Sequence, residues 1–350
     1  MRVTHYARRL VAAGITALVV AACSGDSSAP TEFNAQGTTA DMAAAQSAFQ
    51  GPQVSSYTAL SPAITAVLGG SAVLKTSAFA IRGTDATRAA RDLAAIVPRG
   101  GAIQAVVMAI PQQYLGTTFV WDVASSAYVA SNLTGAPSQG VRFLLYAVDP
   151  VLQQPVDPLV EVGYVDVTDH GTASTVDVNV RVVEGNVVYL DYDVTAHATS
   201  TTSGVIQISG YASDGATLAN FELGLTVTQT STSETLAFSY RVNVPSRSLT
   251  LTWTITMTGT GSSDYTATLD FVVNGPNGNV RLTGSYGVSV QTLTIRVNGA
   301  VFATVDMTGA EPVITDANGQ PLSSDDEASM QAIVEFFEGS GGMLEGITGL

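Results

Sequence analysis

The feature that most constrains the fold is a strict alternation of apolar and hydroxyl side chains in residues 248–259, which read SLTLTWTITMTG. Every odd position from 249 to 257 is apolar, and every even position from 250 to 258 is threonine. Because successive side chains of a β-strand point to opposite faces of the sheet, this segment is predicted to be one strand with an apolar and a hydroxylated face. Such a strand is about twice the usual length.

Similar alternating runs follow one another along most of the chain. They begin with TTFVWD at residue 117 and end with AVFATV at residue 300, with roughly 10–15 residues from one run to the next. Residues that tolerate positive φ separate them, as in 184–186, 213–215, 274–278 and 298–299. The sequence therefore predicts a mainly β fold, a large antiparallel meander of about a dozen long strands curled as a half-barrel, with a sandwich or a closed barrel as alternatives.

Short helices are predicted on both sides of this sheet. Residues 56–68 and 85–97 carry apolar side chains at helical spacing and end at glycine or proline. Residues 101–110 fit either a helix or a strand. Residues 323–338 begin with two serines and a run of acids, which is typical of a capped helix start.

The apolar side of the predicted sheet is larger than these few helices can cover. The sheet can close on itself around a solid core, or curl around the helices and leave an apolar cavity. A third possibility, a barrel that spans a membrane, fits poorly because aromatic side chains make up only 7% of the chain and do not gather at strand ends. If a cavity exists, we expect Leu249, Leu251, Trp253 and Ile255 to line it and to bind a lipid or another hydrophobic ligand.

The N-terminus has the pattern of a secretory signal. Three arginines lie among the first nine residues, and residues 10–22 form an apolar run that is short for a membrane span. The junction Val20-Ala21-Ala22-Cys23 holds the single cysteine of the chain and resembles the lipobox of bacterial lipoproteins. In that class, signal peptidase II cuts before a cysteine whose thiol has received diacylglycerol. The resemblance implies a lipidated Cys23 and a membrane anchor.

The same resemblance implies a place in the cell envelope. Ser24, rather than aspartate, after the cysteine favours the outer membrane if the organism has two membranes. The body of the chain resembles, in architecture only, the half-barrel lipoproteins of the lipoprotein-localisation class, and no binding residue of that class can be matched to a position here. The expected organisation is a signal peptide at 1–22, a lipidated cysteine and flexible tether at 23–41, a helical part at 42–116, the sheet at 117–321, and a helix with a loose tail at 322–350.

Composition limits the possible partners. The formal charge is −15 and the chain has one lysine, Lys75, so its surface is expected to repel nucleic acid. With 46% hydrophobic residues the chain has enough apolar material for a large core. A single cysteine rules out an intramolecular disulfide.

Two groups of acids are candidates for sites of chemistry. Asp166, Asp169 and His170 have side chains of the kinds that bind metal. The pattern equally fits Asp166 on the solvent-exposed face of a strand and Asp169 and His170 in a turn. Asp191 and Asp193 lie two apart on one strand, as a general acid and base could, but a solvated face explains them equally.

A third group, Asp316, Asn318 and Gly319, begins like a calcium loop, yet Pro321 follows and no acid closes it. The chain has no nucleophile elbow, P-loop or dinucleotide-binding glycine pattern. The sequence therefore predicts a noncatalytic protein without a cofactor or metal. The alternative to ligand binding is a solid-cored structural or protein-interaction module displayed on the lipid anchor.

Overall fold

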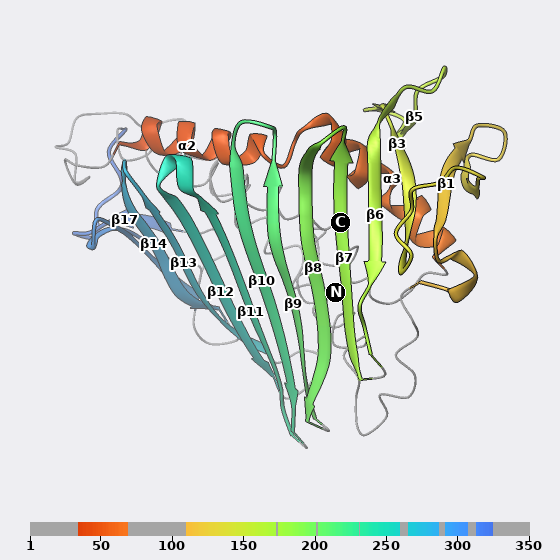
Figure 1. Cartoon of the computed structure of the whole chain (residues 1–350). Helices are drawn as coiled ribbons and strands as arrows, with labels where there is room; N and C mark the ends of the chain where they lie inside the picture. The colour runs from red at the N-terminus through yellow and green to blue at the C-terminus, as the bar shows by residue number, and fades with distance from the viewer. Residues whose placement is uncertain are drawn as a thin grey trace.

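The computed structural model describes residues 34–68, 110–172, 174–200, 202–230, 232–259, 265–286, 291–306 and 313–324. Within these ranges the protein is mainly β, with one large open sheet and two α-helices (Figure 1). The large sheet has 15 strands, most of them antiparallel, and a separate two-stranded sheet is formed by β4 and β5.

The helices are α2 (Ala35–Ser47) and α3 (Pro52–Val67), and short 3-10 turns cover Gln112–Tyr114 and Pro245–Arg247. The first strands are β1 (Thr117–Asp122), β2 (Ala127–Ala130), β3 (Gly140–Tyr146), β4 (Val148–Asp149), β5 (Gln154–Pro155), β6 (Glu161–Asp169), β7 (Thr175–Glu184), β8 (Val187–Ser200) and β9 (Ser203–Ser213). The remaining strands are β10 (Leu218–Gln229), β11 (Glu234–Val244), β12 (Leu249–Gly259), β13 (Tyr265–Gly275), β14 (Gly278–Tyr286), β15 (Gln291–Val297), β16 (Ala300–Asp306) and β17 (Val313–Asp316).

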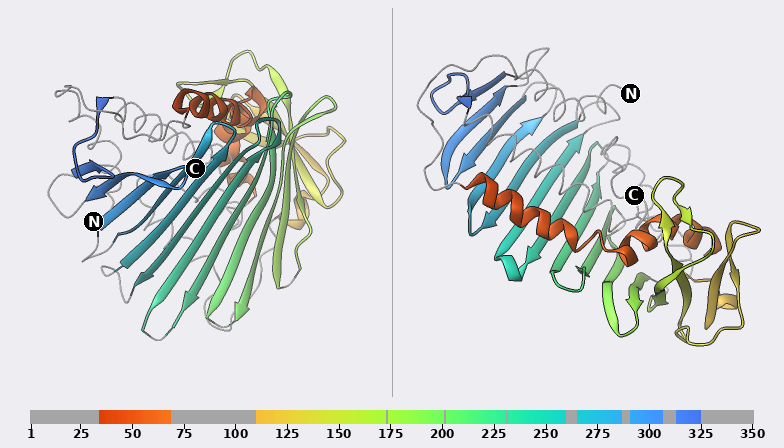
Figure 2. Two further views of the ribbon diagram at one scale, coloured as in Figure 1. Left: turned by 90° about the vertical axis from the view of Figure 1, so that its left-hand side faces the viewer. Right: turned by 90° about the horizontal axis from the view of Figure 1, so that it is seen from above.

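The sheet is a meander over most of its width. From β6 to β17 each strand pairs with the next along the chain, and the full order is β17-β16-β15-β14-β13-β12-β11-β10-β9-β8-β7-β6-β3-β1-β2. The two ends of this order, β17 and β2, are edges, so the sheet does not close into a barrel or form a sandwich. Figure 2 shows that it twists and curls along its length. The predicted antiparallel meander is confirmed, and the two alternatives are not.

One part of the topology has no counterpart in the sequence prediction. Strand β1 pairs with β3 in parallel, with Phe119 opposite Phe143, while β2 folds back on the outer side of β1. A stacked ring pair at this crossing, 4.8 Å between the centroids of Phe119 and Phe143, is part of the core. Alternating patterns specify strands but not which non-consecutive strands pair.

The predicted hairpin turns are confirmed by their backbone conformations. Asn298 and Gly299 have φ of 49° and 84°, as a two-residue turn with both central residues at positive φ requires. Gly185 and Gly215 likewise have φ of 58° and 90°. These turns set the register, which places the alternate apolar residues of neighbouring strands on one face.

Helix α3 confirms the helix predicted at 56–68 but begins four residues earlier. Pro52 occupies its first turn, where a missing N–H costs no hydrogen bond, and Gly51 precedes it. The helix predicted at 85–97 lies outside the described residues. So do the ambiguous segment 101–110, except for Ile110, and the helix predicted at 323–338, except for its first two residues.

Helix α2 corrects the predicted tether. Residues 35–41, expected to be flexible, form its first two turns, and the Asn34 side chain accepts a hydrogen bond from the Gly37 N–H at 2.9 Å. The segment lacks an apolar stripe of helical period, so the sequence pattern did not indicate a helix. Its alanines favour a helix intrinsically, and contacts with the sheet hold it in place.

These contacts run along one edge of the molecule. The Asn277 amide donates to Asp41 at 2.7 Å, the Ser47 hydroxyl donates to Asp214 at 2.8 Å, and the Gln53 amide donates to Glu184 at 2.6 Å. Asn277, Asp214 and Glu184 lie in three hairpin turns at the same ends of the strands. We call this edge, crossed by α2 and α3, the helical rim (Figures 1 and 2).

Close approach at the start of the helical rim requires a glycine. A Cβ atom on Gly37 would overlap the side chain of Asn277. The backbone carbonyl oxygen of Asn277 accepts the Asn34 N–H at 3.1 Å. The helix therefore begins in direct contact with the β13–β14 turn.

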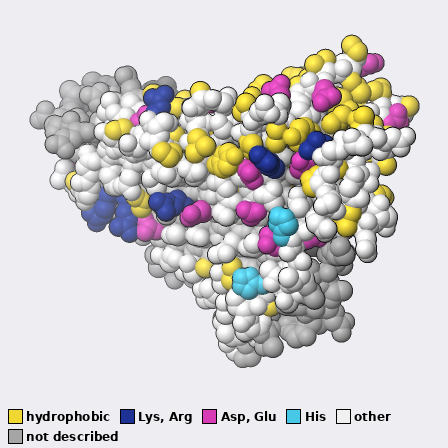
Figure 3. Space-filling view, in the orientation of Figure 1, with side chains coloured by type: hydrophobic (Ala, Val, Ile, Leu, Met, Phe, Trp, Pro, Cys, Tyr) yellow, Lys and Arg dark blue, Asp and Glu magenta, His cyan; other side chains and the backbone are white. Residues whose placement is uncertain are grey.

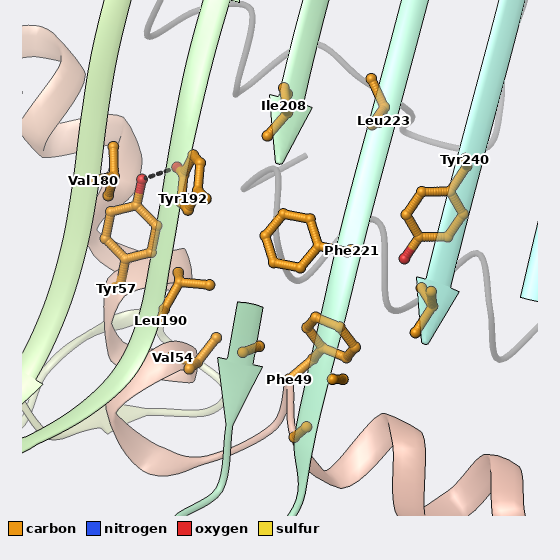
Figure 4. Close-up of a cluster of buried hydrophobic side chains, with 14 of the residues drawn as sticks. Phe49, Val54, Tyr57, Val180, Leu190, Tyr192, Ile208, Phe221, Leu223 and Tyr240 are labelled. Carbon is orange, nitrogen blue, oxygen red and sulfur yellow. Dashed lines mark hydrogen bonds between the residues drawn. The ribbon is translucent and has the colours of Figure 1, made fainter. Parts of the chain in front are cut away.

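The main core lies between the two helices and the face of the sheet that they cover. Phe49 packs on Phe221, with ring centroids 6.0 Å apart, and Tyr192 packs on the same ring at 6.1 Å (Figure 4). Val54 and Leu190 are fully buried beside them. We call this side of the sheet the inner face and the opposite side the outer face.

Candidate functional site

The predicted ligand-binding residues all lie on the inner face, on β12. Their neighbours across β11 and β13 are also apolar: Trp253, for example, lies opposite Tyr240 on one side and Phe271 on the other. Ile255 lies opposite Phe238 and Leu269. The strict alternation of the sequence therefore does produce a continuous apolar surface that crosses several strands.

Burial changes along β12. Leu249 and Leu251 are each 1% exposed and belong to the same buried cluster as Met42 of α2. Trp253 and Ile255, two and four residues further along, are half-buried. The structure thus places the first two predicted residues in the core near the helical rim and the other two on the inner face beyond it.

Three aromatic side chains surround this transition. The rings of Phe238 and Trp253 meet edge to face with centroids 6.2 Å apart, and Trp253 and Phe271 do the same at 5.9 Å. Such geometry is favourable for aromatic pairs. We call Phe238, Trp253 and Phe271 the aromatic row.

A second apolar cluster lies further from the helical rim. Its buried members, on β9, β10 and β11, are Ile206, Leu225, Val227 and Leu236. Phe238 and Met257 pack against it, and Phe238 also packs against the main core. The inner face is therefore apolar well beyond α2 and α3, and among the described residues no helix lies over this part.

Two kinds of buried tyrosine hydroxyl lie on the inner face. Those of Tyr57 and Tyr192 share a hydrogen bond of 2.8 Å, whereas that of Tyr240 is buried without a partner (Figure 4). Burial raises the pKa of Tyr57 and of Tyr240, so both phenols are neutral near pH 7. Of the charged groups discussed next, Asp166, Asp191 and Asp193 alternate with buried inner-face residues and so lie on the outer face.

Asp166, Asp169 and His170, which were only an alternative as metal ligands, have other partners or are exposed. Asp166 accepts two hydrogen bonds from the Arg142 guanidinium, at 2.7 and 2.8 Å, and this guanidinium also lies 3.6 Å from the centre of the Tyr164 ring. Asp169 accepts the Gly171 N–H in a turn, and His170 is exposed. Among the described residues no group of three potential metal ligands is found.

Asp191 and Asp193 do share one face, as predicted, and that face is the outer one. The Asn179 amide nitrogen lies 2.9 Å from an Asp191 oxygen and 3.1 Å from an Asp193 oxygen. Arg181 lies 3.6 Å from Asp191. These residues belong to a band of charges across the outer face (Figure 3), where exposure favours a solvated surface over a shielded acid–base pair.

Asp316 organises a turn. Its carboxylate accepts the N–H groups of Asn318 and Gln320, both at 2.8 Å, and these bonds lower the pKa of its carboxyl, with that from Gln320 acting most strongly. The loop interpretation of this segment is the one that the structure supports.

One cleft was missed by the sequence reasoning. It has a volume of about 500 Å³ and lies between the α2–α3 junction and the β4–β5 hairpin. Phe49, Gln50 and Gln153 are among its lining residues, and the described lining contains no charged side chain. The hairpin is formed by two strands of two residues each, which are too short to produce an alternating signal.

Cys23 and the segment that resembles a lipobox lie outside the described residues. No helix among the described residues is long and apolar enough to cross a membrane.

Comparisons with known protein families, with curated proteins and with solved structures found no match.

Proposed function

We propose that this protein is a noncatalytic lipoprotein of the cell envelope, anchored at Cys23, in the outer membrane where two membranes exist. It holds a lipid or another hydrophobic ligand against the inner face. The ligand lies at the aromatic row and Ile255, beyond the part that α2 and α3 cover. No catalytic group, cofactor or metal takes part.

The observation that carries the ligand proposal is the change in burial along β12. Leu249 and Leu251 are packed in the core, while the same apolar row continues into half-buried Trp253 and Ile255. Leaving large apolar side chains accessible to water costs free energy, and a hydrophobic ligand would recover it. Leu249 and Leu251 then belong to the buried core and lie outside the site.

The anchor rests on the sequence alone. Cys23 is the single cysteine and stands where a lipobox requires it. Replacement of Cys23 by serine is expected to move the protein from the membrane to the soluble fraction. Unchanged fractionation, with no acyl mass on the mature N-terminus, would contradict the anchor.

A specific observation also favours the alternative, a solid-cored interaction module. The buried core runs without interruption from Met42 and Phe49 of the helical segment to Val297 and Phe302 near the far edge of the sheet. Such a protein would bind its partner through the outer face or the turns. The two proposals differ in whether Trp253 changes its surroundings when a lipid is added.

The chain offers a direct test because it has only two tryptophans, Trp121 and Trp253. In a Trp121→Phe variant all tryptophan fluorescence comes from Trp253. Addition of a long-chain fatty acid to the Cys23→Ser form of this variant is expected to shift its emission to shorter wavelength in a saturable way.

The matched control is Trp253→Phe, in which Trp121 reports from β1 and is expected not to respond. Ile255→Asp should abolish the response of Trp253 because it places a charge in the apolar site. No response of Trp253 to fatty acids or phospholipids would favour the interaction module.

A further inference from the structure

The β4–β5 hairpin carries the most exposed large apolar side chains among the described residues. Val151 is 85% exposed and Leu152 is 68% exposed, and both lie in the turn between the two strands. Single exposed apolar residues are common, but two adjacent ones at the end of a projecting hairpin are a typical contact site. We call Val151 and Leu152 the apolar tip.

Local hydrogen bonds hold the apolar tip outward. The Asp149 carboxylate accepts the N–H of Val151 at 2.8 Å and that of Leu152 at 2.9 Å, and its carbonyl oxygen accepts the Gln153 N–H at 2.9 Å. The N–H groups of Leu152 and Val151 lower the pKa of the Asp149 carboxyl, which keeps it ionised. The turn is therefore ordered with its two apolar side chains pointing into solvent.

The apolar tip lies on the helical rim. The helix pair starts at the β13–β14 turn, where Asn34 contacts Asn277, and α3 passes the end of β3, where Ser56 donates to the Tyr146 carbonyl oxygen. The hairpin leaves the sheet directly after this point and projects beyond the helices (Figure 1). Hydrophobic side chains gather over this corner in the space-filling view (Figure 3).

The position of Cys23 in the sequence indicates what the apolar tip contacts. Ten residues separate Cys23 from Asn34, and such a segment spans at most roughly 33–36 Å when fully extended. Asn34 lies at the other end of the same rim. An anchored chain therefore has the Asn34 end of its helical rim within reach of the lipid surface that holds Cys23.

The charges around the hairpin select the kind of lipid. Residues 148–161 contain Asp149, Asp157 and Glu161 and no lysine or arginine. This segment would be repelled by an anionic surface, and it lacks the basic residues that bind one. An uncharged or zwitterionic lipid surface is the matching partner.

We propose that the apolar tip inserts into the interfacial layer of a zwitterionic lipid surface and turns the helical rim toward the membrane. This inference rests on the anchor in the proposed function and is independent of the ligand on the inner face. An acyl anchor and a short apolar segment together give firmer attachment than either alone.

The test uses the lack of any other cysteine. In the mature lipidated chain the Cys23 thiol is acylated, so a new cysteine takes an environment-sensitive fluorophore at one place. Val151→Cys and the control Val313→Cys, which is 58% exposed on the edge strand β17, are labelled and reconstituted into phosphatidylcholine vesicles. We expect a shift to shorter wavelength and quenching by lipid-borne quenchers at 151 but not at 313.

Equal emission at the two positions, or at 151 with and without vesicles, would overturn the proposal. A label at 151 that stays exposed to solvent on protein-free vesicles and is shielded from solvent only in native envelopes would indicate a protein partner. This result would also overturn the proposal. If mass spectrometry finds no acyl group at Cys23, the anchor fails separately. The apolar tip is then tested by mixing the labelled Cys23→Ser chain with excess vesicles. If the emission of the label at 151 does not change, the proposal is overturned.

A second variant measures the contribution of the tip without relying on a label. Val151→Asp with Leu152→Asp should weaken vesicle binding of the Cys23→Ser chain at least about tenfold, since it removes two apolar side chains from the contact. Val313→Asp should leave binding unchanged. Equal loss in both variants would show that charge, not the tip, is responsible and would refute the proposal.

Discussion

Leu251→Ala separates packing from ligand binding on a single strand. Leu251 is 1% exposed between Val242 of β11 and Val273 of β13, both of which are also buried. The change removes three carbon atoms, which at about 0.8 kcal/mol per carbon amounts to roughly 2.4 kcal/mol of lost burial. The neighbouring strands are fixed by their hydrogen bonds and cannot collapse into the space, so the remaining cavity should raise the cost toward about 4 kcal/mol.

The assay is urea unfolding of the Cys23→Ser chain, followed by circular dichroism, with Thr252→Ala as the control. Thr252 is the next residue on β12 and faces the other side of the sheet, where it is half-exposed. The control is expected to change the free energy of unfolding by less than about 1 kcal/mol. Fatty-acid affinity should not change in Leu251→Ala. A stability loss below about 1 kcal/mol together with a large loss of affinity would refute the assignment of Leu251 to the core.

Two further predictions concern stability. Tyr57→Phe should lower the free energy of unfolding by about 1 kcal/mol because it breaks the hydrogen bond to Tyr192. Tyr240→Phe should raise the free energy of unfolding by a similar amount, since that buried hydroxyl has no partner. Thermal or urea unfolding gives the sign of each change, and equal signs would contradict the assignment. The pKa of the Asp214 carboxyl is lowered: partial burial acts against this, but hydrogen bonds from the Thr217 and Ala216 N–H groups and from Ser47 outweigh it. A carboxyl with a lowered folded-state pKa adds stability at pH values above its ordinary pKa of 3.8, and this stability is lost as the pH falls through the folded-state pKa. Asp214→Asn should therefore reduce the dependence of the free energy of unfolding on pH in this range. An unchanged pH dependence would argue against the contact.

The long strands could be predicted because each carries its own alternation and its own turn. The register of β12, for example, follows from odd-numbered apolar residues that must share a face with those of β11. The turn at Asn298-Gly299 was also readable, since few other residues adopt its backbone conformation. Local signals of this kind do not depend on distant parts of the chain.

Features set by distant contacts could not be predicted. Helix α2 owes its position to Asn277 and Asp214, which lie in turns more than 160 residues away in sequence. The parallel pairing of β1 with β3 likewise depends on a partner that alternation cannot specify. At the candidate site, alternation predicted four residues on one apolar face, but it could not show that Leu249 and Leu251 belong to the buried core while Trp253 and Ile255 are half-buried.

The central claim is that the inner face beyond the helices holds a hydrophobic ligand. The most direct test is native mass spectrometry of the Cys23→Ser chain purified from an envelope-derived soluble fraction, followed by organic extraction. We expect one lipid per chain, and its loss in Ile255→Asp with the fold intact. If the chain with Ile255 intact shows only the mass of the protein and takes up no added fatty acid or phospholipid, the claim is contradicted and the solid-cored interaction module remains.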